Sequence, residues 1–105
     1  LASAANNTVI MQFSASESVA HIIAENVASA FEHECDGDGF DDRVREIVVA
    51  RLVRNLLSAM PTRSCNALTA ACNRALDDTV GETGFIGPRV ETIDLEDGSV
   101  TMRRP

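Results

Sequence analysis

The chain has 105 residues, of which 45% are hydrophobic, and this length and composition predict one domain with one core. Its 16 acidic and 9 basic residues give a formal net charge of −7, which argues against nucleic acid as a partner because phosphates need a basic face. No run of about 18 apolar residues occurs, so the sequence predicts no membrane-spanning segment.

The N-terminal segment is expected to begin as a flexible terminus and to continue as a strand. Residues 1–7 are small and polar, and Leu1 in place of Met indicates a processed precursor or a vector-derived start. Residues 8–14 alternate in the manner of a β-strand that is covered mainly on one side. The residues that share its apolar face are Val9, Met11 and Phe13.

A first helix is predicted to begin near Ala15. Ser14 and Glu17 have the spacing of a capping box, in which each side chain accepts a hydrogen bond from a free backbone N–H group. An apolar stripe with helical spacing follows, and its members are Val19, Ile22, Ile23, Val27, Ala30 and Phe31. Two glycines and several acids in residues 35–42 predict that this helix has ended there.

A second helix is predicted from Asp42 to Met60, capped by Asp41 or Asp42. Its apolar residues cover an arc that is too wide for one contact surface, and they are Val44, Ile47, Val48, Val49, Leu52, Val53, Leu56 and Leu57. We therefore expect it to be the most buried helix, packed on both sides or against a second copy of the chain.

A third helix is predicted after Pro61, with Thr62 or Ser64 as its N-cap and with Gly81 and Gly84 at its end. Its expected inner face comprises Cys65, Leu68, Cys72, Ala75, Leu76 and Val80. The glycine-rich residues 81–88 follow a helix and precede a strand, whereas a phosphate loop has the opposite order. We interpret them as a turn in which Phe85 and Ile86 hold the chain to the core or contact a partner.

The C-terminal residues predict a β-hairpin, because Asp97-Gly98 is a preferred pair for a two-residue type I′ turn. This turn places Leu95 opposite Val100 and, further along, Ile93 opposite Met102 and Glu91 opposite Arg104. Pairing with the N-terminal strand would complete a three-stranded antiparallel sheet. The predicted fold is therefore a mostly helical α+β domain over residues 8–105, with three helices packed on that sheet in the order β-α-α-α-β-β.

The acidic segment Glu34-Cys-Asp-Gly-Asp-Gly-Phe-Asp-Asp42 resembles an EF-hand calcium loop over some of its positions. Carboxylates in such a loop ligate calcium, and the candidate ligands are Glu34, Asp36, Asp38 and Asp41. Arg45 stands where the loop should end with a bidentate Glu, and a cation cannot ligate another cation. We interpret the segment as a solvated turn that caps the second helix, with calcium binding as the alternative.

The three cysteines, Cys35, Cys65 and Cys72, leave several arrangements open. Cys65 and Cys72 are about 10 Å apart along one helix, too far to bridge each other, whereas Cys35 can reach either of them. Reduced thiols are the simplest interpretation; one disulfide with a spare thiol and an intermolecular disulfide are alternatives. A zinc site that also uses His33 lacks the close cysteine pair of a zinc knuckle.

Without an activated nucleophile, an acid–base pair or a cofactor motif, the sequence predicts no catalytic or cofactor-binding residue. We therefore expect a non-enzymatic protein interaction module, with a regulatory, accessory or assembly role. Its partner would be another protein or a second copy, bound through the second helix or an open sheet edge to make a homodimer. A small calcium-binding domain is the alternative, and no compartment is indicated.

Overall fold

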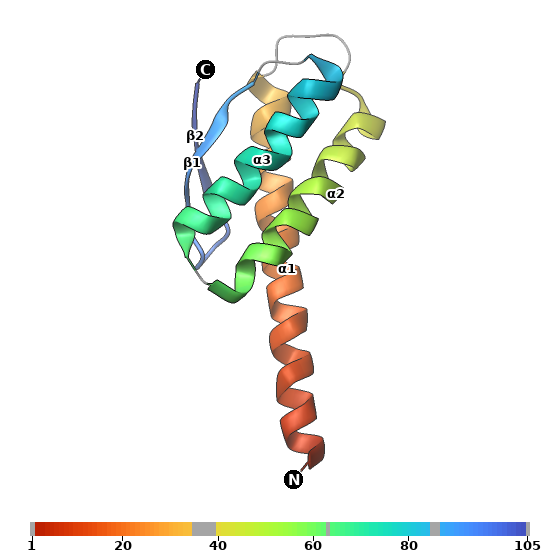
Figure 1. The fold of residues 1–105 in the computed structure, drawn as a ribbon, viewed down its shortest axis with the longest axis vertical. Coiled ribbons are helices and arrows are strands. Elements are labelled where there is room, and N and C mark those ends of the chain that lie inside the picture. Colours follow the sequence, from red (N-terminus) through yellow and green to blue (C-terminus); the bar gives the residue numbers. More distant parts are fainter. Residues whose placement is uncertain (1, 35–39, 63, 85–86, 105) are drawn as a thin grey trace.

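The computed structural model describes the backbone of residues 2–34, 40–62, 64–84 and 87–104, and side chains within these ranges from Ser16 onward except Thr83. The fold is mostly helical α+β (Figure 1). Its elements in chain order are α1 (Ala2–Glu34), α2 (Asp42–Ala59), the 3-10 turn η1 (Met60–Thr62), α3 (Cys65–Thr83), β1 (Arg89–Ile93) and β2 (Val100–Arg103).

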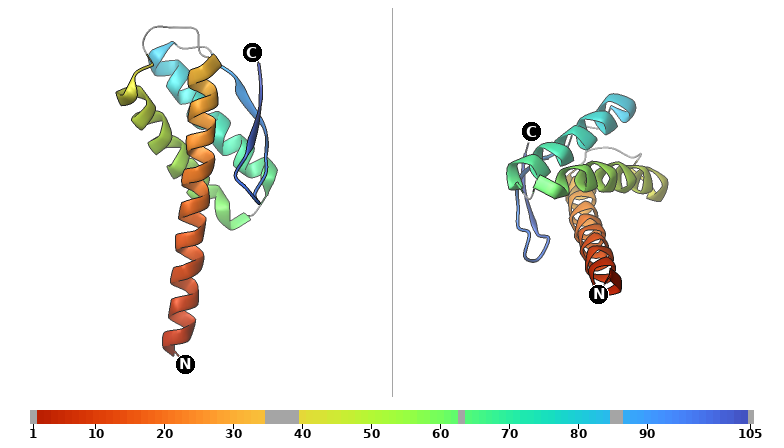
Figure 2. Two further views of the ribbon diagram at one scale, coloured as in Figure 1. Left: turned by 180° about the vertical axis from the view of Figure 1, so that it is seen from behind. Right: turned by 60° about the horizontal axis from the view of Figure 1, so that its bottom comes forward.

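The helices and the hairpin surround one core. α2 packs against both α1 and α3, and the antiparallel hairpin formed by β1 and β2 packs on α3 and, less extensively, on α1 (Figures 1 and 2). The N-terminal turns of α1 extend beyond the other elements (Figure 1). The extents of the chain along its principal axes are 55 × 25 × 20 Å.

The predicted N-terminal strand is wrong, because α1 begins at Ala2 and continues through residues 8–14. The described sheet consequently has two strands and not three. A short apolar run fits both periodicities, since residues 9 and 13 share a helix face as well as a strand face. No Gly or Pro occurs before Gly37 to break the helix. The flexibility of residues 1–7 and the domain boundary at residue 8 stay predictions.

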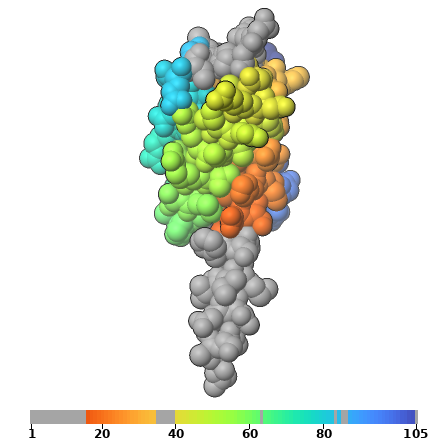
Figure 3. Space-filling model, turned by 90° about the vertical axis from the view of Figure 1, so that its right-hand side faces the viewer, coloured from red at the N-terminus to blue at the C-terminus, as the bar shows by residue number. Residues whose placement is uncertain are grey.

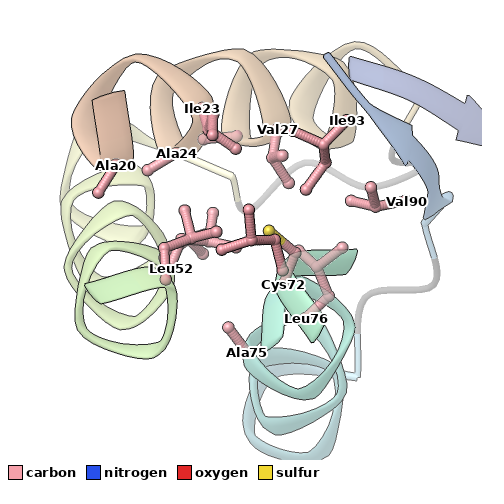
Figure 4. Packing of buried hydrophobic residues seen from close by; sticks show 14 of the residues in the cluster. Ala20, Ile23, Ala24, Val27, Leu52, Cys72, Ala75, Leu76, Val90 and Ile93 are labelled. Atoms are coloured by element: carbon pink, nitrogen blue, oxygen red, sulfur yellow. The ribbon is translucent and has the colours of Figure 1, made fainter. Parts of the chain in front are cut away.

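The core is aliphatic and rich in alanine (Figure 4). α1 supplies Ala20, Ile23, Ala24, Val27, Ala28 and Phe31 to it. α2 supplies Val48, Leu52 and Leu56, and α3 supplies Leu68, Ala71, Cys72, Ala75 and Leu76. Val90 and Ile93 close the core from the hairpin side (Figure 4).

The helical patterns predict the larger buried side chains of these inner faces but miss the buried alanines Ala20, Ala24, Ala28 and Ala71. Two predicted inner residues are exposed. Ile22 of the first stripe is 49% exposed, and Cys65 of the third is exposed. α2 is not the most buried helix, because α1 and α3 each place more side chains in the core. α2 meets both neighbours with one side, and its other side, including Ile47 at 45% exposure, faces outward.

The ends of α2 and α3 follow the sequence signals. Asp41 caps α2 by accepting a hydrogen bond from the N–H group of Val44 at 2.9 Å. Ser64 caps α3 in the same way through the N–H group of Ala67 at 3.3 Å. Gly84 ends α3 with φ +74°, a left-handed conformation that glycine adopts without strain.

The hairpin is confirmed, but its predicted register is wrong. Ile93, and not Leu95, lies opposite Val100, and Val90 lies opposite Met102, with a bulge between Val90 and Thr92. The turn is longer than two residues, because the N–H group of Asp94 bonds to the carbonyl of Ser99 and that of Gly98 bonds to the carbonyl of Asp94, both at 2.9 Å.

Aspartate side chains and a contact with α1 favour this longer turn. The carboxylates of Asp94 and Asp97 accept hydrogen bonds from the N–H groups two residues later, each at 2.8 Å. The Asn26 amide of α1 donates to the Gly98 carbonyl at 2.7 Å. Gly98 has φ +74°, and an added Cβ would lie 2.5 Å from Cγ2 of Ile22, so only glycine fits there.

A second glycine lies where the chain passes Phe31. A Cβ added to Gly87 would lie 2.4 Å from Cε2 of the Phe31 ring, well inside van der Waals contact. The ring centroid of Phe40 lies 5.8 Å from that of Phe31, and the two rings are tilted by 45°. The connection to β1 therefore lies directly against an aromatic ring of α1.

Asn73 of α3 holds β1 in place. Its amide donates to the Val90 carbonyl at 3.1 Å, and its carbonyl oxygen accepts from the Val90 N–H group at 2.8 Å. Arg89 adds an ion pair to Asp77 of the same helix. The side chain of Asn73 thus bonds to the backbone of β1 as a neighbouring strand would.

We expect Asn73→Ala to lower the free energy of unfolding by about 1–3 kcal/mol, because two partly buried backbone groups of Val90 lose their partner. Asn66→Ala, at an exposed asparagine of the same helix, is the matched control and should cost less than about 0.5 kcal/mol. Urea unfolding measures both. Equal stability of the two variants would contradict the assigned role of Asn73.

We expect Leu52→Ala to cost about 2–5 kcal/mol, because it empties a fully buried position between α1 and α3. Denaturant titration followed by far-ultraviolet circular dichroism measures this change. A variant as stable as the parent would contradict the packing described for α2.

Candidate functional site

An open hollow runs along the outer face of α2 beside α1, and Figure 3 shows these two helices side by side. Its volume is about 700 Å³. It is lined by His21 and Glu25 of α1 and by Arg45, Glu46, Val49, Ala50, Val53, Arg54, Leu57 and Ser58 of α2. No sequence motif predicts it, because its two walls come from segments that only the fold brings together.

The floor of the hollow is the outer part of the wide apolar arc of α2. Val49, Val53 and Leu57 repeat every four residues and are partly exposed, whereas the inner row of α2 is fully buried. A helix needs only one apolar face to join a monomeric core. These three side chains pack against the edge of the core, and the part of their surface that lines the hollow is not covered by the residues that the structure describes.

Arg45 fixes one wall of the hollow by joining α2 to α1. Its guanidinium lies 2.7 Å from a carboxylate oxygen of Glu25 and 3.0 Å from one of Glu32, and it also donates to the hydroxyl of Ser29. The hydrogen bond to Glu25 is the main reason that the pKa of Arg45 is raised above its usual value. Arg45 is thus committed to a partner within the chain.

Arg51 likewise forms an ion pair within the chain, with a residue of α3. It pairs with Glu82 at 2.5 Å, and this hydrogen bond raises the pKa of Arg51 and lowers that of Glu82. By contrast, Glu46 and Arg54 on the outer face form no ion pair with any other residue that the structure describes. Their charges face solvent beside the apolar floor.

The described residues do not assemble the candidate calcium site. Asp41 uses its carboxylate to cap α2, and a carboxylate oxygen of Glu34 lies 3.9 Å from Nε of Arg104. Asp36 and Asp38 lie outside the described residues. Within the described ranges no three His, Cys, Asp or Glu side chains come together as metal ligands would.

The two described thiols have different surroundings. Cys65 is exposed at the start of α3, and Cys72 is buried in the core; both are free among the residues described. Burial raises the pKa of the Cys72 thiol to about 12, so it is neutral at physiological pH and unsuited to act as a nucleophile. Cys35, the candidate partner of either thiol, lies outside the described residues.

Comparisons with protein-family models, with curated proteins and with solved structures find no match. Across the described ranges, no helix has both the length and the apolar character needed to cross a bilayer. The outer face of α2, whose apolar residues the chain covers only in part, is therefore the candidate site on geometric grounds.

We predict that millimolar calcium leaves the melting temperature unchanged, because Asp41 already serves as a cap and Arg45 stands at the last ligand position. Real binding would raise the stability by about 2.7 kcal/mol at a hundredfold excess over the dissociation constant. Differential scanning calorimetry with and without calcium measures this. A calcium-dependent rise that disappears in an Asp36→Asn, Asp38→Asn variant would contradict the prediction.

Proposed function

We propose that the chain is a non-enzymatic protein interaction module that associates with itself through the outer face of α2, in a regulatory, accessory or assembly role. The carrying observation is the partly exposed apolar row of Val49, Val53 and Leu57 beside an open hollow. Contiguous apolar surface bordered by polar residues is typical of protein interaction sites, because its burial releases ordered water.

The local charge on α2 favours a second copy as the partner. The chain carries a net charge of −7, which makes two copies repel each other in general. The outer face of α2 differs from this average, since its exposed arginines Arg43 and Arg54 balance its exposed acids Asp42 and Glu46. Two such faces can approach without the repulsion that acidic surfaces would impose.

The size of the domain also favours a partner. A chain of this length buries only about 60–70% of the surface that its unfolded form exposes, which leaves little reserve of stability. Covering Val53 and Leu57 would add apolar burial at about 25 cal/mol per Å². Self-association would therefore stabilise the fold by covering the exposed apolar surface of α2.

The edge of β2 that pairs with no described strand is a weaker route to self-association. The strand has only four residues, Val100–Arg103, and short edge strands that carry charge resist pairing with other chains. The corresponding edge of β1 is partly taken by Asn73. The outer face of α2 is accordingly the surface we assign to the interaction.

We expect Ala50→Glu to weaken dimerisation by about tenfold or more, because a charge would be buried at the centre of the interface without a partner. Ala70→Glu makes the same change at an exposed alanine of α3 and should leave dimerisation unchanged. Sedimentation velocity over a concentration series measures both dissociation constants. A parent chain that stays monomeric throughout, or equal effects of the two variants, would refute the proposed function.

A further inference from the structure

We propose that two copies pair their α2 helices in antiparallel orientation about a two-fold axis at Ala50, with Glu46 of each copy beside Arg54 of the other. This inference rests on the proposed self-association and specifies its orientation and register. It follows from the positions of charged and apolar residues along the outer face of α2.

A two-fold interface is self-complementary, so that if residue i of one copy contacts residue j of the other, j also contacts i. In an antiparallel helix pair, residues equally far from the axis in opposite directions lie at the same level. Glu46 precedes Ala50 by four residues and Arg54 follows it by four. An axis at Ala50 therefore produces two equivalent Glu46–Arg54 pairs, one on each side of the centre.

One pair of apolar residues follows the same symmetry. Ile47 and Val53 lie three residues before and after Ala50, so each shares a level with the other residue of the second copy. Ala50 itself is exposed at the middle of the face. Its small side chain allows the two helices to approach within the usual interaxial distance of about 8–10 Å.

Parallel pairing of the same faces is unfavourable. It would place every residue opposite its own copy, so that Glu46 meets Glu46 and Arg54 meets Arg54. Like charges in such positions repel, whereas the antiparallel register places opposite charges together. The charge pattern therefore selects the orientation.

Glu46 and Arg54 are also available for this pairing. They are about 12 Å apart along the helix, too far to pair within one copy. In the described part of the chain they form no ion pair with other residues, whereas Arg45 and Arg51 of the same helix are bound to acids of α1 and α3. Arg45 and Arg51 bind acids of the same chain. Glu46 and Arg54 face outward and can bind a second copy.

A charge-reversal cycle on the full chain tests the register. The variants are Glu46→Arg, Arg54→Glu and both together, and sedimentation velocity measures the dissociation constant of each. We expect each single reversal to weaken dimerisation by about tenfold or more, since it places like charges together at two symmetric points. The double variant should return to within about threefold of the parent, because the opposite pairing is restored.

Matched controls separate the effect of the changed net charge from the effect of the local charge pairing. Glu91→Arg and Arg74→Glu make the same charge changes at exposed positions on β1 and α3, and neither should alter dimerisation more than about twofold. Circular dichroism confirms that each variant is folded before its association is measured.

The outcomes separate this inference from the proposed function. A parent chain that does not dimerise would refute both. Dimerisation that is unaffected by either single reversal, or single losses that the double variant does not recover, would overturn the antiparallel register and leave self-association standing. Weakening by both single variants with recovery in the double variant is the result that supports the register.

Discussion

The packing of the inner row of α2 against both α1 and α3 is the interaction on which the rest of the structure depends. In the described part of the chain, α1 and α3 make few direct contacts with each other, and α2 and the hairpin span the space between them. Leu52 lies fully buried at this junction. Because α2 meets both neighbours with the same side, its opposite side is left outward, and the candidate site is a direct consequence of that arrangement.

Arginine side chains reinforce this packing between elements. Arg45 joins α2 to α1, Arg51 joins α2 to α3, and Arg89 joins β1 to α3. Such solvent-exposed pairs each add little stability, yet they fix which elements lie side by side. The guanidinium is suited to this role because its planar set of donors can contact two carboxylates at once, as Arg45 does with Glu25 and Glu32.

The sequence predicts those features of the fold that depend on residues within one helical turn of each other. The caps at Asp41 and Ser64 and the glycine at the end of α3 are confirmed, since each satisfies backbone groups within one turn. The N-terminal strand and the hairpin register were wrong because short apolar runs are ambiguous and because the turn is shaped by Asn26 and Ile22, distant residues of α1. The hollow could not be predicted for the same reason. The sequence shows the wide apolar arc of α2, but it does not show that His21 and Glu25 of α1 form the other wall.

The close approach of Gly87 to Phe31 has a consequence for how the sequence can vary. The two residues are far apart in the sequence but in direct contact in space, so that one methyl carbon added at Gly87 would overlap the Phe31 ring. A larger residue at this position is compatible with the fold only if the residue at position 31 becomes smaller. In related sequences that keep this architecture, a larger residue at position 87 should therefore be accompanied by a smaller one at position 31, whereas a smaller residue at position 31 alone would leave only a gap beside the glycine.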